Sequence, residues 1–221
     1  MLTVHHLNNS RSQRVLWLLE ELGVAYDIVR YQRQPDMRAP AELRAIHPLG
    51  KSPVITDEGR TIAESGAIAE YLIDTYGSGR LIPPPHTPER LRYGYWLHYA
   101  EGSAMPPLLL KLLFTLMPKR APALLHPLVR KVCNQAMMAF VNPQLKLHME
   151  FWESELSKSE WFAGDAFTAA DIQMSFPLEA AAARGGLEQG HPKAMAFLDR
   201  IHARPAYRRA LEKGGPYAVG R

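Results

Sequence analysis

The segment from Ser52 to Leu72 reads SPVITDEGRTIAESGAIAEYL and carries the signals of a hairpin followed by a helix. β-Branched residues at 54–56 and 61–62 flank the turn residues Asp57-Glu58-Gly59, a pattern that predicts two short strands. Apolar residues at helical spacing from 65 to 76 then predict a helix. The hairpin and this helix together indicate the second half of a small α+β unit.

Residues before this segment supply the first half of that unit. Residues 1–7 and 25–31 favour strands, and apolar residues recur at helical spacing over 11–22. Residues 32–50 are polar and rich in proline, which predicts a loop with a helical turn at 41–46. The order β-α-β, loop, β-β-α predicts an α+β fold of the thioredoxin-like kind over residues 1–78.

A change in composition marks the boundary of a second domain. Residues 79–88 read GRLIPPPHTP, and their consecutive prolines predict a linker. After it the strand signal disappears, so residues 89–221 are expected to form an all-α helical bundle. The expected helices cover 89–100, 108–117, 124–156, 169–184 and 193–202.

Composition and charge exclude several classes of protein. The hydrophobic fraction of 47% and the charged fraction of 22% are ordinary for a soluble globular protein. The net charge of +4 is small, and no nucleic-acid partner is predicted, because such binding also needs a clustered basic face. The one cysteine, Cys133, rules out an intrachain disulfide and is expected to be packed in a helix. The N-terminus shows no secretion signal, so a cytoplasmic location is expected.

No metal site is predicted. His5 and His6 are adjacent, and alternation along a strand would point them to opposite faces of the sheet. The segment HPLGKS, which runs from His47 to Ser52, has too few glycines for a phosphate-binding loop. Lys51 in this segment remains a candidate for binding a carboxylate.

Pro53 stands inside a strand pattern, and proline cannot donate a hydrogen bond to a neighbouring strand. Two interpretations are open. A trans proline at the start of a strand is the more common arrangement. A cis bond would instead turn the backbone of Ser52 outward, where its N–H and C=O could pair with an extended peptide.

Glu64 and Ser65 stand at the beginning of a predicted helix. In one interpretation Ser65 is the N-cap and Glu64 is a solvated acid. In the other, the helix N-terminus and the Ser65 hydroxyl bind a carboxylate while Glu64 pairs with an ammonium. Such a site would hold both charges of an α-amino acid.

Ser10 also has two interpretations. The spacing Ser10-x-x-Gln13 fits a capping box for the first helix. The hydroxyl could instead stabilise an anion such as a thiolate beside the helix end. Lowering a thiol pKa from about 8.5 by two units takes about 2.7 kcal/mol. A hydrogen bond to a charged group gives about 1.5–3 kcal/mol and the helix end about 0.3–1, so no metal or base is required.

Four segments together resemble the cytosolic glutathione S-transferases, closest to bacterial and fungal members with a serine at the first helix. The segments are NNSRSQRVLWLLEELGV, HPLGKSPVITDEG, IAESGAIAEYL and WFAGDAFTAADI, and they cover both predicted domains in the family's order. The resemblance implies an N-terminal domain that binds glutathione as co-substrate and a helical domain that binds a small hydrophobic electrophile. It also implies a detoxifying transferase that forms a homodimer.

The resemblance assigns roles to individual residues. It implies that Ser10 activates the thiol, with Asn8 and Asn9 as neighbours that could assist. The residue before a cis proline pairs with the cysteinyl backbone of glutathione, which here is Ser52 before Pro53. By the same resemblance, Glu64 and Ser65 bind the γ-glutamyl end of glutathione. Lys51 binds the glycyl carboxylate, with His47 as a second candidate. A peroxidase or isomerase at the same site and a non-catalytic glutathione-binding scaffold are the alternatives.

The helical domain gives weaker signals. Tyr99, Ser103 and Met105 are candidates for the electrophile pocket, although leucines and methionines on a helix usually belong to a core. Late in the chain, Thr168 and Asp171 have the spacing of an N-capping pair. The segment from Lys111 to Lys131 combines apolar runs with six basic residues, His126 included, and has no acid. A solvated hairpin is the favoured interpretation of it over a dimer element or a surface for anionic membranes.

Overall fold

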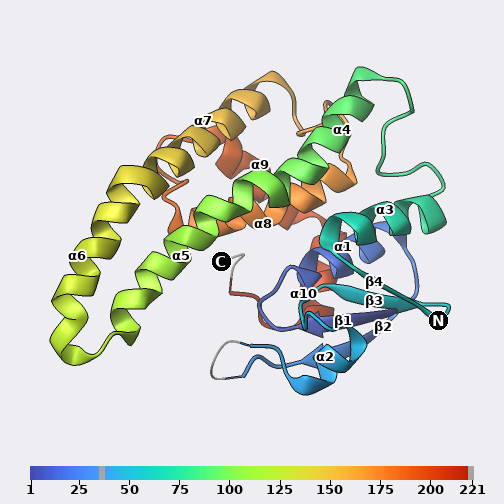
Figure 1. The fold of residues 1–221 in the computed structure, drawn as a ribbon. Coiled ribbons are helices and arrows are strands. Elements are labelled where there is room, and N and C mark those ends of the chain that lie inside the picture. The colour runs from blue at the N-terminus through green and yellow to red at the C-terminus, as the bar shows by residue number, and fades with distance from the viewer. Residues whose placement is uncertain (35–37, 219–221) are drawn as a thin grey trace.

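A computed structural model describes residues 1–34 and 38–218 of the chain (Figure 1). Its first part is a four-stranded sheet with helices on both faces, and the rest of the chain is helical. This arrangement confirms the predicted thioredoxin-like fold followed by a helical domain. Residues 35–37, part of the predicted loop over 32–50, lie outside the described residues.

The sheet has the strand order β2-β1-β3-β4. β1 runs parallel to β2 and antiparallel to β3, and β3 is antiparallel to β4. α1 is the crossover between the parallel pair, and its leucines are buried against the sheet, as the helical spacing predicts. α1 and α3 cover one face while α2 lies on the other (Figure 1). The elements are β1 (Thr3–Leu7), α1 (Ser12–Leu22), β2 (Asp27–Tyr31), α2 (Ala41–Ile46), β3 (Val54–Asp57), β4 (Arg60–Ala63) and α3 (Ser65–Tyr76).

The hairpin between β3 and β4 is tied to α3 by its turn residue. Asp57 is buried, and its carboxylate accepts hydrogen bonds from the hydroxyl groups of Tyr71 and Tyr76 on α3. A buried carboxylate needs such donors to offset its lost hydration. These bonds therefore hold the second half of α3 against the hairpin.

Two long helical runs form an antiparallel hairpin in the second domain (Figure 1). The first joins α4 (Pro88–Tyr99) to α5 (Met105–Arg120) through the π-helical turn η1 (Ala100–Ala104). We predicted separate helices over 89–100 and 108–117, and Gly102, Pro106 and Pro107 between them are residues that disfavour a helix interior. The prediction was wrong: both prolines stand in the first turn of α5, where a missing N–H is tolerated, and η1 shifts the hydrogen-bond pattern before them.

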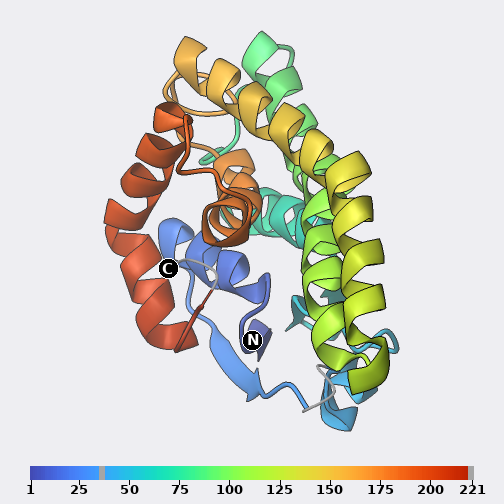
Figure 2. The ribbon, with the colours of Figure 1, turned by 90° about the vertical axis from the view of Figure 1, so that its left-hand side faces the viewer.

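The second run consists of η2 (Ala123–Leu125), α6 (His126–Ala136), η3 (Met137–Val141) and α7 (Asn142–Lys158). It covers the predicted helix over 124–156 but contains a π-helical turn, η3, before Pro143. Cys133 is buried on α6, as expected for a packed cysteine. Figure 2 shows this run beside the first one along their whole length.

α8 (Ala169–Arg184) forms the centre of the helical domain and packs against α4, α9 and α1. The predicted capping pair is present at its start: the Asp171 carboxylate accepts hydrogen bonds from the Thr168 N–H at 2.8 Å and the Thr168 hydroxyl at 3.0 Å. Two helices follow, α9 (Pro192–Ala203) and α10 (Pro205–Gly214). We did not predict α10, which packs against α1.

Candidate active site

Ser10 lies between the end of β1 and the beginning of α1, and its side chain is buried. Its Oγ is 2.7 Å from the Oγ of Ser12 and accepts a hydrogen bond from the Ser12 N–H. It also lies 3.3 Å from the Oγ of Ser52. The predicted capping box is not formed, because α1 begins one residue later than it requires and the Gln13 side chain does not bond the backbone there. The Ser10 hydroxyl is thus positioned by other hydroxyls.

Behind Ser10, a buried chain of polar groups leads toward the C-terminal helix. Ser12 Oγ lies 2.9 Å from Nδ1 of His6. Burial and the nearby Arg30 lower the pKa of His6 to about 4, and a hydrogen bond to the backbone of Gly214 only partly opposes this shift. His6 is therefore neutral at pH 7, and one ring nitrogen donates while the other accepts.

Ser52 stands directly before β3, and the Ser52-Pro53 peptide bond is cis. The Ser52 hydroxyl donates to the carbonyl of His5 at 3.1 Å and accepts the N–H of Leu7 at 3.4 Å. The β1–β3 pairing ends at His5 and Val54, so this hydroxyl continues the bonding between the strands by one step. Ser10 and Ser52 are thereby brought together from sequence positions 42 residues apart.

Glu64 and Ser65 occupy the start of α3, but their capping roles differ from the prediction. Glu64 is the N-cap, with a positive φ of 69°, and Ser65 is the first helical residue. The Glu64 side chain is exposed, whereas Ser65 is buried. Ser65 Oγ accepts hydrogen bonds from Arg14 at 3.2 Å and from Gln173 at 3.4 Å. Ser65 is therefore held by side chains of α1 and α8.

Arg14 and Glu101 form an ion pair that joins the two domains. Arg14 is buried, and its guanidinium contacts the Glu101 carboxylate and donates to the Gln173 carbonyl at 2.6 Å. Arg11 lies 3.0 Å from the second Glu101 oxygen. Burial alone would raise the pKa of Glu101, but Arg14 and Arg11 hold it below its usual value. Ser65 donates to the same carboxylate at 3.4 Å, so this network supports the start of α3.

A basic cavity of about 660 Å³ lies beside Ser52. Lys51 lines it with an exposed side chain, and arginines contribute most of the other charged groups. His47 is not among the lining residues; its Nδ1 is buried and has no hydrogen-bond partner in the described part of the chain. The lining consists of Leu7, Arg11, Arg33, Arg38, Ala39, Arg44, Pro48, Leu49, Gly50, Lys51 and Ser52.

The two asparagines before Ser10 are engaged with the backbone. The side-chain oxygen of Asn9 accepts the N–H of Ala218 at 2.8 Å, and that of Asn8 accepts the N–H of Arg33 at 2.8 Å. Asn9 has a positive φ of 50°, which asparagine tolerates better than most residues. Both side chains therefore shape the loop that carries Ser10.

The three candidates for the electrophile pocket lie in different surroundings. Tyr99 is buried in the helical core, where its hydroxyl contacts His148 and accepts from Trp152 at 3.1 Å. Met105 is buried, and Ser103 is exposed. None of the three lines the basic cavity. Their assignment to an electrophile pocket therefore stays a prediction.

Comparison with known proteins identifies the family. The model for the N-terminal domain of glutathione S-transferases matches residues 1–74, and the model for their C-terminal domain matches residues 116–205. The chain is 36% identical to glutathione S-transferase 3 of Schizosaccharomyces pombe over 213 residues, which cover 96% of this chain and 88% of the relative. This chain belongs to the glutathione S-transferase family.

Two further glutathione S-transferases are similar to this chain over nearly its whole length. Glutathione S-transferase 1 of Saccharomyces cerevisiae is 33% identical over 222 residues, which cover 96% of this chain and 95% of the relative. The crystal structure of a glutathione S-transferase from Actinobacillus pleuropneumoniae gives a TM-score of 0.81 at 32% identity and covers 100% of this chain and 96% of that one. The chain is therefore a transferase of the class that uses glutathione as a substrate.

Sequence reasoning missed the main charged contact in this glutathione S-transferase. Glu101 is the only acid between Glu89 and Glu150, and an isolated acid in so long a basic and apolar stretch was an available signal. Its partners, Arg11 and Arg14, stand in a different domain. Within the described residues, no three His, Cys, Asp or Glu side chains cluster as metal ligands would.

Proposed function

We propose that this glutathione S-transferase conjugates the thiolate of bound glutathione to a small hydrophobic electrophile, and that the Ser10 hydroxyl stabilises the thiolate. The observation that carries this proposal is the 3.3 Å distance between the Ser10 and Ser52 hydroxyl groups. In the family the residue before the proline pairs with the cysteinyl backbone of glutathione. A cysteinyl group bound at Ser52 therefore places its sulfur near Ser10.

The charges near Ser52 and the start of α3 suit the two ends of glutathione. The exposed Glu64 carboxylate would pair with the γ-glutamyl ammonium, while Ser65 and the N-terminus of α3 would bind the α-carboxylate. Lys51, at the edge of the basic cavity, would bind the glycyl carboxylate. His47 and Asn9 belong to the same proposed site as secondary residues, since His47 lies outside the lining and Asn9 already binds Ala218.

The remaining assignments rest on the family. Residues 1–78 would bind glutathione, residues 79–88 would link the domains, and residues 89–221 would bind the electrophile, with Tyr99, Ser103 and Met105 as first candidates. The protein would act in detoxification as a homodimer in the cytoplasm.

A combined turnover and binding assay tests this function. We expect the purified protein to bind immobilised glutathione and to conjugate glutathione to a chloronitrobenzene, with a product that absorbs in the near ultraviolet. Reduction of an organic hydroperoxide without conjugation would assign the site to a peroxidase instead. Retention on the resin without any turnover would indicate a glutathione-binding scaffold.

A further inference from the structure

The free end of the helical hairpin exposes a group of apolar side chains. This hairpin tip, defined here as Met117 to Val132, comprises the end of α5, η2 and the first part of α6. Leu124 is 92% exposed and Leu128 62%. The other exposed apolar side chains of the tip are Met117, Leu125 and Val132. Figure 1 shows that the tip extends away from α8 and α9 at the lower left of the molecule.

The hairpin tip also lies in the segment of the chain that carries the excess of positive charge. Residues 102–149 contain six of the 26 lysines and arginines and none of the 22 acids. The rest of the chain therefore has 20 basic residues against 22 acidic ones, so the positive excess belongs entirely to this segment. Four of the six, all with exposed side chains, lie in the hairpin tip: Lys119, Arg120, Arg130 and Lys131.

We propose that the hairpin tip binds the surface of an anionic lipid bilayer. Exposed leucines next to lysines and arginines suit this surface, because apolar side chains enter the interface while basic groups attract anionic headgroups. The contact would be peripheral. No helix in the described residues is long and apolar enough to cross a bilayer.

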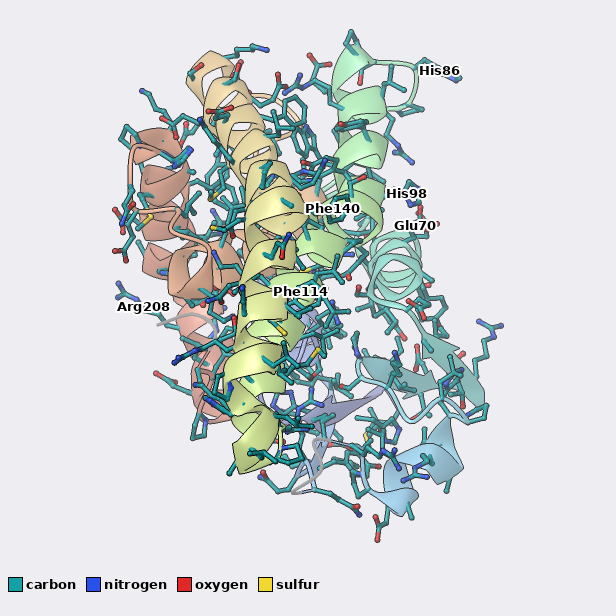
Figure 3. All side chains as sticks on the ribbon, turned by 60° about the vertical axis from the view of Figure 1, so that its left-hand side comes forward. Glu70, His86, His98, Phe114, Phe140 and Arg208 are labelled. Carbon is teal, nitrogen blue, oxygen red and sulfur yellow. The ribbon has the colours of Figure 1, made fainter. Side chains whose placement is uncertain are left out.

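Charge also argues against a symmetric contact between the hairpin tips of two copies of the chain. Two hairpin tips in a symmetric contact would bring eight basic groups together, four from each copy, with no acid from either segment to pair with them. Phe114 and Phe140, the aromatic residues labelled on the hairpin in Figure 3, lie away from its free end and nearer to α4. Phe140 itself therefore lies outside the hairpin tip.

Vesicle sedimentation tests the proposal directly. The intact protein is mixed with vesicles of phosphatidylcholine alone, or of phosphatidylcholine with phosphatidylserine, at low and at high salt. The charge variant is Arg130→Gln with Lys131→Gln, and its matched control is Lys193→Gln with Arg208→Gln, which removes the same net charge from exposed positions on α9 and α10. Leu128→Ser is paired with Leu147→Ser, because the two leucines are 62% and 60% exposed.

We expect the protein to pellet with anionic vesicles at low salt and to be released by high salt, because ions screen the attraction. The charge variant should lose about 30-fold in partitioning, which corresponds to about 1 kcal/mol for each basic residue removed. Leu128→Ser should weaken binding as well, while both controls bind as the unmodified protein does. Glutathione conjugation in solution should be unchanged in all of them.

Three results would overturn the proposal. The first is no sedimentation with anionic vesicles at low salt. The second is an equal loss of binding in the charge variant and its control, which would assign the attraction to net charge alone. The third is self-association that Leu128→Ser abolishes in a protein that binds no vesicles, which would assign the hairpin tip to contact between copies.

Discussion

The single hydroxyl hydrogen of Ser10 has two competing acceptors before glutathione binds, Ser12 and Ser52. Burial lowers the pKa of His6, so the ring is neutral, and in the tautomer that carries its hydrogen on Nε2 the Nδ1 atom accepts the hydrogen of Ser12. In that tautomer Ser12 does not donate to Ser10, and at 2.7 Å it accepts from Ser10 instead. A thiolate that accepts the Ser10 hydrogen must therefore displace Ser12 as its acceptor.

Removing the Ser12 hydroxyl, which competes for the Ser10 hydrogen, should strengthen the binding of the thiolate. We expect Ser12→Ala to lower the pKa of bound glutathione by about half a unit to one unit, because a neutral hydrogen bond contributes about 0.5–1.5 kcal/mol. Thiolate absorbance followed against pH measures this change. A raised pKa would instead mean that Ser12 donates to Ser10 and holds it in place. The variant should also lose about 1–3 kcal/mol of stability, since His6 Nδ1 is left buried without a donor.

Glu64 is the residue whose role in ligand binding is tested most simply. Glu64→Gln should weaken glutathione binding by roughly 2 kcal/mol, about 30-fold in Kd, because the ammonium of the ligand loses its charged partner. Calorimetric titration measures the affinity, and Glu70→Gln on the same helix is the control, since Glu70 is also exposed. Equal affinity in the two variants would show that Glu64 is a surface acid with no role in glutathione binding.

The first turn of α8 contains a fully buried carboxylate, Asp171. Burial raises the pKa of Asp171 from an ordinary value of 3.8 to about 6, although hydrogen bonds from Phe162 and Thr168 oppose the shift. The folded protein therefore holds this proton more tightly than the unfolded chain does. The stability that results is full below about pH 4 and is lost as pH rises through about 6.

Urea unfolding of the unmodified protein and Asp171→Asn at several pH values tests this linkage. The free energy of unfolding of the unmodified protein should fall by about 2.4 kcal/mol relative to the variant between pH 4 and pH 7. Contributions from other groups largely cancel in the difference. A difference that stays constant over this range would show that folding does not shift the pKa of Asp171.

Elements with large apolar residues at regular spacing were predictable from the sequence. α1 and α3 were found because leucine and isoleucine mark their buried faces. α10 was missed because it buries mainly small or mixed residues, Ala206, Tyr207 and Ala210, which give no such pattern. The continuity of α4 with α5 was missed because single-residue preferences do not encode the π-helical turn between them.

The candidate site divides in a similar way. Ser10, Ser52 and Ser65 could be selected because they stand beside predicted element boundaries, although the sequence left capping open as a second interpretation for Ser10 and Ser65. Their actual hydrogen-bond partners could not, because Ser10 and Ser52 meet only when β1 and β3 pair. Local rules offered capping as one of two interpretations for Ser10 and Ser65, and in the structure Arg11 and Glu64 are the N-caps instead, because capping rules consider only neighbours along the chain.

Across the whole molecule, the Glu101–Arg14 pair connects the start of α3, where we propose that glutathione binds, to the helical domain. Glu101→Gln would leave the Arg14 guanidinium buried without its counter-charge. We expect a loss of about 2 kcal/mol in stability, less than for a fully buried pair because Glu101 is 31% exposed. Urea unfolding measures the loss.

The same variant should bind glutathione several-fold more weakly, since Ser65 loses one of its partners. Glu150→Gln is the matched control, because Glu150 pairs with Lys146 on the surface at 3.7 Å and should change stability by less than about 1 kcal/mol. Loss of stability with unchanged affinity would limit the ion pair to a structural role.

The central claim, that Ser10 stabilises the glutathione thiolate, is tested most directly by titrating enzyme-bound glutathione. Thiolate absorbance is followed against pH in the unmodified protein and in Ser10→Ala, with urea unfolding as a check on the fold. We expect a bound thiol pKa about two units below the free value of about 8.5, and a return toward that value in Ser10→Ala. An equally low pKa in both proteins would contradict this role of Ser10 and assign the stabilisation to the N-terminus of α1 or to Asn8 and Asn9.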